Sequence, residues 1–255
     1  MAGRVEGKVV IVTGGASNPG LGYASAHMLA REGAKVVVTD IDVEGAEECA
    51  NSIREAGGDA IAIQQDVVNE SDWQAVLDVT VESYGRLDVL VNNAGIAILK
   101  PFAELTLVEF NLQISVNLTS VFLGSQAAMR QLRQQGSGGV IINLSSVAAL
   151  VGLSRCGAYS AAKGGVRAMS RSIAIDGAPD NIRCNTIFPG VIWTNMQAAA
   201  IGGDGLDSRI PTTRVPLARA GSPDDIAANV VYLASDEAGY VTGAEFTIDA
   251  GMTAQ

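Results

Sequence analysis

A tyrosine and a lysine four residues apart, Tyr159 and Lys163, are the side chains of this sequence best suited to transfer a proton. The spacing places both on one face near the start of an expected helix at residues 159–176. A free phenol has a pKa of about 10 and is a poor base at neutral pH, but a nearby ammonium favours its ionised form. The pair therefore predicts that Tyr159 is a general acid/base that needs neither histidine nor metal.

A serine adds a third polar group to this pair. Ser146 lies thirteen residues before Tyr159, after an expected strand at residues 140–144. Its hydroxyl can donate a hydrogen bond to a substrate oxygen on which charge develops. A Tyr–Lys pair at this spacing also occurs on ordinary helices, so the hypothesis of catalysis needs support from a cofactor site elsewhere in the chain.

A glycine-rich turn supplies that support. It reads Thr13-Gly14-Gly15-Ala16-Ser17-Asn18-Pro19-Gly20-Leu21-Gly22, between an expected strand at 9–12 and an expected helix at 21–32. Glycines let the backbone approach a pyrophosphate, and a helix N-terminus offers free N–H groups. The predicted cofactor contacts in this turn are Gly14, Ser17, Asn18, Gly20, Leu21 and Gly22.

Asp40 ends the second expected strand, at residues 34–40. A carboxylate there can accept both hydroxyls of an adenosine ribose and repels the additional phosphate of NADP. The turn has no Arg or Lys and none immediately follows Asp40, so we predict NAD as the cofactor. The alternative, that Asp40 caps the next helix, is less favourable because Asp42 is better placed as the N-cap.

The following strand ends extend the predicted cofactor site. Asp66 and Val67 end the third strand, where the edge of an adenine is expected. The fourth strand ends in Asn92-Asn93-Ala94-Gly95, whose small residues let the backbone approach a ligand; a purely structural turn is the alternative.

The order of the apolar segments predicts the fold that must hold these residues. Strands are expected at 9–12, 34–40, 60–63, 89–91, 140–144, 182–187 and 245–248, with helices at 21–32, 43–56, 70–84, 109–132, 159–176 and 223–235. Continuous apolar strands separated by helices indicate a parallel sheet covered on both faces. We therefore predict an α/β, Rossmann-type, doubly wound fold of about seven strands in a single domain, 1–255. Residues 194–214 are predicted to form a substrate lid, with an ordinary surface loop as the alternative.

Composition limits the possible partners. The net charge of −10 disfavours nucleic acid and anionic membranes, and no apolar run approaches the length of about 18 residues that a membrane helix needs. The N-terminus lacks signal-peptide features, and the three cysteines are scattered, so a cytoplasmic protein is expected. The single histidine, His27, cannot build a histidine-based metal site, and no metal is predicted. A charged fraction of 17% favours interfaces between copies.

Together these residues resemble the short-chain dehydrogenase/reductase family over essentially the whole chain. The ordered matches are the glycine-rich turn, Asn92-Asn93-Ala94-Gly95, Asn117, Ser146, Tyr159 with Lys163, Pro189-Gly190 with Thr194, and the ending at 241–251. The resemblance implies an NAD-dependent oxidoreductase that interconverts a secondary alcohol and a ketone by hydride transfer, usually as a homotetramer built through the helices that contain Asn117 and Tyr159 and through the C-terminal tail.

The resemblance also implies the role of each residue. Tyr159 would exchange the proton, Lys163 would hold the nicotinamide ribose and lower the Tyr159 pKa, and Ser146 would bind the substrate oxygen. Asn117 would kink its helix and hold a water that links Lys163 to solvent. The implied catalytic set is Asn117, Ser146, Tyr159 and Lys163. The remaining implied cofactor contacts are Ile41, Asn93, Ala94, Gly95, Pro189, Gly190, Ile192, Thr194 and Met196.

Two features leave alternatives open. The turn is two residues longer than the family pattern, and we expect Gly20 and Gly22 to keep their roles while Asn18 bulges outward near the adenosine. The walls expected around the substrate are mostly apolar, which favours a ring or aliphatic secondary alcohol, but Lys100, Arg155 and Arg209 leave a carboxylate possible. Alternatives are a 3-oxoacyl thioester reductase, an enoyl reductase-like relative and a non-catalytic cofactor sensor. The predicted substrate contacts are Ser146, Ala148, Leu153, Tyr159 and Trp193.

Overall fold

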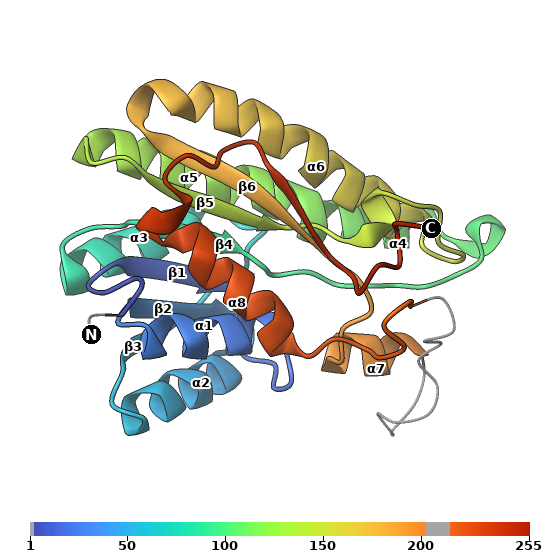
Figure 1. The fold of residues 1–255 in the computed structure, drawn as a ribbon, viewed down its shortest axis with the longest axis horizontal. Coiled ribbons are helices and arrows are strands. Elements are labelled where there is room, and N and C mark those ends of the chain that lie inside the picture. The colour runs from blue at the N-terminus through green and yellow to red at the C-terminus, as the bar shows by residue number, and fades with distance from the viewer. Residues whose placement is uncertain (1–2, 202–214) are drawn as a thin grey trace.

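Seven parallel strands form one twisted sheet in the order β3-β2-β1-β4-β5-β6-β7 (Figure 1). The computed structural model describes residues 3–201 and 215–255. The strands are β1 (Val9–Thr13), β2 (Lys35–Asp40), β3 (Asp59–Gln64), β4 (Val89–Asn92), β5 (Gly139–Leu144), β6 (Ile182–Pro189) and β7 (Glu245–Ile248). The predicted α/β fold is confirmed, and each strand lies where an apolar run predicts it.

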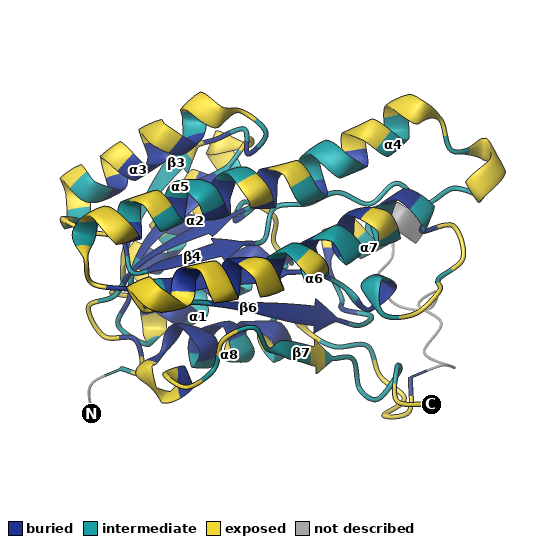
Figure 2. Ribbon diagram, turned by 90° about the horizontal axis from the view of Figure 1, so that it is seen from above, coloured by how far each residue is buried: buried dark blue, intermediate teal, exposed yellow. Residues whose placement is uncertain are grey.

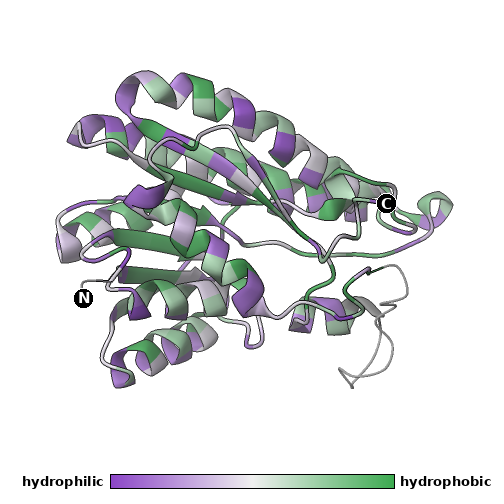
Figure 3. Cartoon of the chain, viewed as in Figure 1, coloured by the Kyte–Doolittle hydropathy of each residue, from purple (hydrophilic) through white to green (hydrophobic). Residues whose placement is uncertain are grey.

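The sheet is buried on both faces because its central strands are apolar at nearly every position. All five residues of β1 are buried, and successive side chains point to opposite faces. Val10 and Val12 join one core, whereas Ile11 joins the other. Figure 3 shows these apolar strands in the interior, and Figure 2 shows that the covering helices expose their outer faces.

Each core is closed by its own set of helices. The first core contains side chains of α1 (Leu21–Arg31), α2 (Val43–Glu55) and α8 (Pro223–Ala234). The second contains side chains of α3 (Glu70–Tyr84), α5 (Ser120–Gln135) and α6 (Gly157–Gly177). No helix among the residues that the structure describes is long and apolar enough to cross a membrane.

The strand order reverses between β1 and β4, since the chain that builds β2 and β3 on one side of β1 returns to build β4 on the other. In doubly wound sheets a ligand crevice opens outside the carboxyl ends of the strands at such a point. The turn after β1 and the Asn92–Gly95 segment after β4 meet there.

Two segments differ from the sequence-based prediction. The helix expected at 109–132 is three elements: α4 (Leu107–Ile114), a π-helical turn η2 (Ser115–Thr119) and α5. The helix begins earlier because Thr106 and Glu109 form a capping box. Of the predicted lid at 194–214, residues Asn195–Ile201 form helix α7, and residues 202–214 lie outside the described residues.

Candidate active site

A cavity of about 590 Å³ lies over the carboxyl ends of β1, β2, β4 and β5. It gathers residues that are far apart in the sequence, from Gly14 to Ala199. The predicted residues that line it are Gly14, Ser17, Gly20, Leu21, Asp40, Ile41, Asp66, Val67, Asn93, Ala94, Gly95, Asn117, Tyr159, Lys163, Thr194 and Met196.

Other predicted residues are not part of this lining. Gly22 packs beneath the turn, where a Cβ would lie 2.2 Å from the Gly14 carbonyl oxygen, and a Cβ on Gly190 would lie 2.7 Å from the Asp249 Cα. Both glycines therefore allow close packing of the backbone, and their contact with the cofactor stays a prediction. The predicted residues outside the lining are Asn18, Gly22, Pro189, Gly190, Ile192, Ser146, Ala148, Leu153 and Trp193.

The glycine-rich turn fits a phosphate ligand. Gly14 has φ of 69°, and a Cβ at Gly20 would lie 2.2 Å from the Ser17 carbonyl oxygen, so side chains are not accommodated at either position. Helix α1 begins at Leu21 with no side-chain cap and no acidic residue in its first turn. Its first N–H groups are therefore available to an anion beside the cavity.

The extra residues of the turn contact α7. The Asn195 Nδ2 donates to the Ser17 Oγ (3.2 Å) and to the Asn18 carbonyl oxygen (3.1 Å), and the Asn195 N–H donates to the Pro19 carbonyl oxygen (3.0 Å). Asn18 is exposed, as expected, and its place near the adenosine stays a prediction. The segment after β6 therefore binds the inserted residues of the turn.

Backbone N–H groups fix the Asp40 carboxylate. Its Oδ2 accepts from the Ala16 N–H (3.0 Å) and its Oδ1 from the Asp42 N–H (3.1 Å). Asp42 is the N-cap of α2 and accepts from the Gly45 N–H. The alternative that Asp40 caps this helix is therefore wrong, and its carboxylate faces the cavity.

Gln65 is a site residue that the sequence analysis missed. It is 1% exposed and lines the cavity between Asp40 and Asp66, and its Oε1 accepts from the Thr39 hydroxyl at 2.6 Å. Its Nε2 is buried without a hydrogen-bond partner among the described residues. Such donors are rarely left unpaired, so this amide suits an acceptor atom of a bound nucleoside.

Asn93 links the segment after β4 to the start of the glycine-rich turn. Its Nδ2 donates to the carbonyl oxygens of Thr13 (2.8 Å) and Gly14 (3.0 Å), while the Thr13 hydroxyl accepts from the N–H groups of Asn93 and Ala94. The side chain of Asn93 is thus structural, and it is the backbone of this segment that lies open to a ligand.

Lys163 lies beneath Tyr159 in α6. It is 4% exposed, its Nζ donates to the Leu144 carbonyl oxygen at 2.8 Å, and Nζ lies 5.8 Å from the centroid of the Tyr159 ring. Burial lowers the pKa of Lys163 to about 8. The ammonium is thus fixed at the end of β5, within the cavity lining.

Burial dominates the ionisation of Tyr159. Burial raises the pKa of Tyr159 to about 12; a hydrogen bond with Ser146 lowers it, and Cys156 raises it. Without a bound cofactor, Lys163 does not bring this pKa below its ordinary value; the predicted lowering also counts on a positively charged nicotinamide ring and stays a prediction for the complex. The Lys163 ammonium is hydrogen-bonded to a carbonyl group under the ring, where it offsets little of the desolvation of the phenolate.

Asn117 occupies the π-helical turn, so the predicted deformation of its helix is confirmed. Its Nδ2 donates to the Ile96 carbonyl oxygen, and its Oδ1 accepts from the Ile96 N–H, both at 2.9 Å. The side chain therefore holds the segment after β4 against the helix, beside Gly95 and Lys163.

Ser146 lies on the substrate side of Tyr159, and the cationic side chains described there have partners within the protein. Ser146 is the N-cap of the short helix η3 (Val147–Ala149) and hydrogen-bonds with Tyr159. Lys100 forms an ion pair with Glu109, and the Arg155 guanidinium donates to the Leu99 carbonyl oxygen. Arg209 lies outside the described residues. Besides Gln65, the lining of the 590 Å³ cavity contains further residues that were not among the predicted contacts: Pro19, Ile96, Ala97, Val116, Leu144, Ser145 and Ala199.

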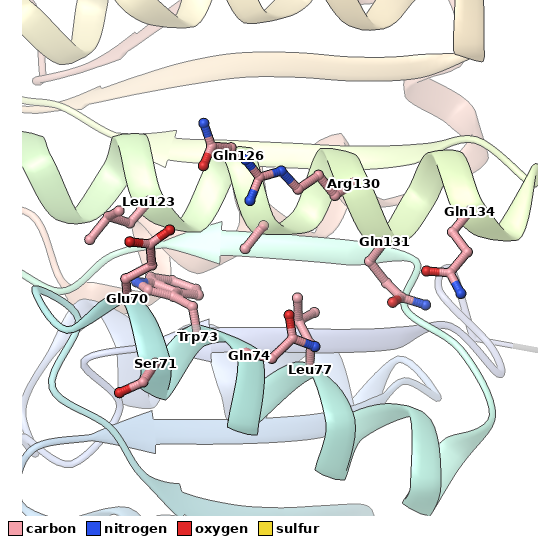
Figure 4. Close-up of a pocket in the computed structure, with 11 residues that line it drawn as sticks. Glu70, Ser71, Trp73, Gln74, Leu77, Leu123, Gln126, Arg130, Gln131 and Gln134 are labelled. Atoms are coloured by element: carbon pink, nitrogen blue, oxygen red, sulfur yellow. The ribbon is translucent and has the colours of Figure 1, made fainter.

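A second cavity of about 450 Å³ lies between α3 and α5 (Figure 4). Glutamines, Arg130 and Glu70 surround the apolar side chains of Trp73 and Leu77 there. None of the predicted catalytic or cofactor residues lines it. No group of three or more metal-binding side chains occurs in the described part of the chain.

The chain belongs to the short-chain dehydrogenase/reductase family. A family model described as enoyl-(acyl carrier protein) reductase matches residues 14–253. A short-chain type dehydrogenase/reductase from Mycobacterium marinum has a similar crystal structure, with a TM-score of 0.93, 30% identity, and coverage of 98% of this chain and 97% of that one.

Two relatives whose names state an activity make the chemistry more specific than the family does. An NADP-dependent (R)-specific alcohol dehydrogenase of Lentilactobacillus kefiri is 42% identical over 100% of both chains. A cyclopentanol dehydrogenase of Comamonas testosteroni is 40% identical over 99% of both. This chain is accordingly an oxidoreductase of the family, with alcohol/ketone chemistry and a nicotinamide cofactor.

Proposed function

We propose that this chain is an NAD-dependent dehydrogenase that interconverts a neutral, apolar secondary alcohol and its ketone. The observation that carries the proposal is that Tyr159 and the buried ammonium of Lys163, which lies 5.8 Å from the centroid of the Tyr159 ring, both line the cavity that gathers the predicted cofactor residues. When bound, the cofactor accepts or supplies the hydride. Tyr159 carries the proton: it donates to the ketone oxygen in reduction and receives the alcohol proton in oxidation. Ser146 donates to the same oxygen as charge develops on it.

The choice of NAD rests on Asp40. The carboxylate lines the cavity with its geometry fixed by two backbone N–H groups, and no cationic residue occurs in the turn at 13–22. A 2′-phosphate would meet a negative charge there without a cation to neutralise it. The relative from Lentilactobacillus kefiri is NADP-dependent, so the cofactor is assigned on this chain's own residues.

The neutral substrate class follows from the charges around the site. Lys100 and Arg155, two of the three cations that could receive a carboxylate, bind Glu109 and a backbone carbonyl group. Two relatives are named for ring alcohols, cyclopentanol and a dichlorocyclohexadienediol. We therefore expect activity on cyclic or aliphatic secondary alcohols.

A substrate panel tests this proposal. Formation of NADH should be seen with NAD and cyclic or acyclic secondary alcohols, and its oxidation with the matching ketones. Reduction of an enone or of a 3-oxoacyl thioester without oxidation of any secondary alcohol would instead support the reductase alternatives. Cofactor binding with no turnover of any of these compounds would support the sensor.

The pKa of Lys163 predicts a pH limb for ketone reduction. Lys163 is cationic only below its lowered pKa of about 8, whereas Tyr159, with a pKa of about 12, stays protonated well above that. We therefore expect log kcat/KM for ketone reduction to be level below about pH 8 and to fall above it, because Lys163 then loses the charge with which it is proposed to hold the nicotinamide ribose. Steady-state rates from pH 6 to 10 measure this, and a level profile through pH 10 would refute it.

We also propose that the protein is a homotetramer. Phe122 and Ile175, on α5 and α6, are exposed by 45% and 72%, and an apolar hollow lies between these helices beside Leu118 and Met169. Light scattering after size-exclusion chromatography should give four times the chain mass of 26.3 kDa. A monomeric mass would contradict the proposal.

A further inference from the structure

The segment that follows β4 lies along α4 and η2 in a regular ladder of contacts. The Asn117 amide binds Ile96 through both backbone groups, as described above. The Gln113 amide does the same to Ile98: its Oε1 accepts from the Ile98 N–H at 3.0 Å, and its Nε2 donates to the Ile98 carbonyl oxygen at 3.3 Å. Glu109 then pairs with the Lys100 ammonium. We call residues 96–100 the strap; Figure 1 shows it running from β4 past α4.

The ladder has a geometric basis. An extended chain advances about 3.3 Å per residue, so every second residue of the strap is displaced by about 6.6 Å. A helix rises about 1.5 Å per residue, so every fourth residue is displaced by about 6 Å. Glu109, Gln113 and Asn117 are four apart, and their partners are two apart and run in the opposite direction. Gln113 is the middle rung and is fully buried.

The other edge of the strap contacts the segment that leads into Tyr159. The Lys100 N–H donates to the Arg155 carbonyl oxygen at 3.0 Å, and the Arg155 guanidinium donates to the Leu99 carbonyl oxygen. Within the cavity, Ile96 and Ala97 are lining residues. The strap therefore forms a wall between α4 and the segment ahead of the catalytic tyrosine.

From this we propose that Gln113 is a positioning residue that fixes the substrate wall and thereby sets the size of alcohol accepted; this rests on the proposed function. Gln113 touches neither the reacting atoms nor the glycine-rich turn. It holds Ile98, the part of the strap between the rung at Asn117 and the contacts at Arg155. Loss of the Gln113 amide leaves both backbone groups of Ile98 without this partner, and the wall relaxes.

The test is Gln113→Met, which keeps the side-chain length and removes both hydrogen bonds. The KM for a bulky ring alcohol should rise by about tenfold, the effect expected of an unpaired backbone group. The kcat for a small acyclic alcohol should stay within about threefold of wild type. The ratio of kcat/KM for the two alcohols should shift accordingly, with the Kd for NADH unchanged. Gln74→Met, on the exposed surface of α3, is the matched control and should leave every value unchanged.

Hydrogen exchange provides a readout that does not depend on turnover. In Gln113→Met, amides of residues 96–100 should exchange faster, while those of β4 keep their protection. Should this variant not fold, Gln113→Glu retains the acceptor for the Ile98 N–H and is measured in the same way, with a smaller shift expected. An unchanged substrate ratio, or unchanged protection of residues 96–100, overturns the inference. Failure of the wild type to oxidise any alcohol overturns the proposed function instead, and the exchange of residues 96–100 then decides the role of Gln113 in positioning the strap.

Discussion

Replacing Tyr159 by phenylalanine is expected to lower kcat for alcohol oxidation and ketone reduction by about a thousandfold, within the range that general acid–base catalysis contributes. The variant keeps the ring and loses only the hydroxyl that hydrogen-bonds with Ser146. Lys163 and the glycine-rich turn are untouched, so the Kd for NADH, measured by fluorescence, should stay within about twofold.

Tyr84→Phe is the matched control, because it removes a phenol hydroxyl that donates to Asp59 at 2.8 Å, at the far end of α3. It should leave kcat unchanged. Retention of more than about a tenth of the activity in Tyr159→Phe would show that another group carries the proton.

Asp40→Ala is expected to weaken NAD and to relax the discrimination against NADP. A hydrogen bond to a charged group contributes about 1.5–3 kcal/mol, so the Kd for NAD should rise by about 10- to 100-fold. Removing the negative charge also removes its repulsion of a 2′-phosphate, so the Kd for NADP should fall. Titration of both cofactors measures the ratio.

The neighbouring carboxylate provides the control for this experiment. Asp42 caps α2 and does not line the cavity. Asp42→Ala should lower the free energy of unfolding by about 0.5–2 kcal/mol, as loss of an N-cap does, without altering the NAD/NADP ratio. If Asp40→Ala keeps the wild-type ratio, the assigned role of Asp40 at the ribose is wrong.

Local sequence signals predicted the sheet and most of the residues that line the candidate cofactor cavity. The apolar runs at β1 and β4 end in Thr13-Gly14 and Asn92–Gly95, and parallel strands bring such ends to one edge. Asp40 was predictable for the same reason. These are features that a residue type and its place on a strand determine.

The features of the site that the sequence did not predict depend on tertiary contacts. Gln113 and Gln65 are single amides whose partners, Ile98 and Thr39, lie elsewhere in the chain, so no spacing reveals them. The inserted residue Asn18 is bound by Asn195, which follows β6. The pKa of Tyr159 is dominated by burial, a property of the assembled site rather than of the Tyr–Lys spacing.

A crystal structure with the dinucleotide and a ring ketone tests the central assignment most directly. The ketone oxygen should lie within hydrogen-bonding distance, about 2.6–3.2 Å, of both the Tyr159 phenol oxygen and the Ser146 Oγ, with the carbonyl carbon facing the nicotinamide. A ketone oxygen bound to other groups, with the Tyr159 hydroxyl directed away from it, would contradict the assignment.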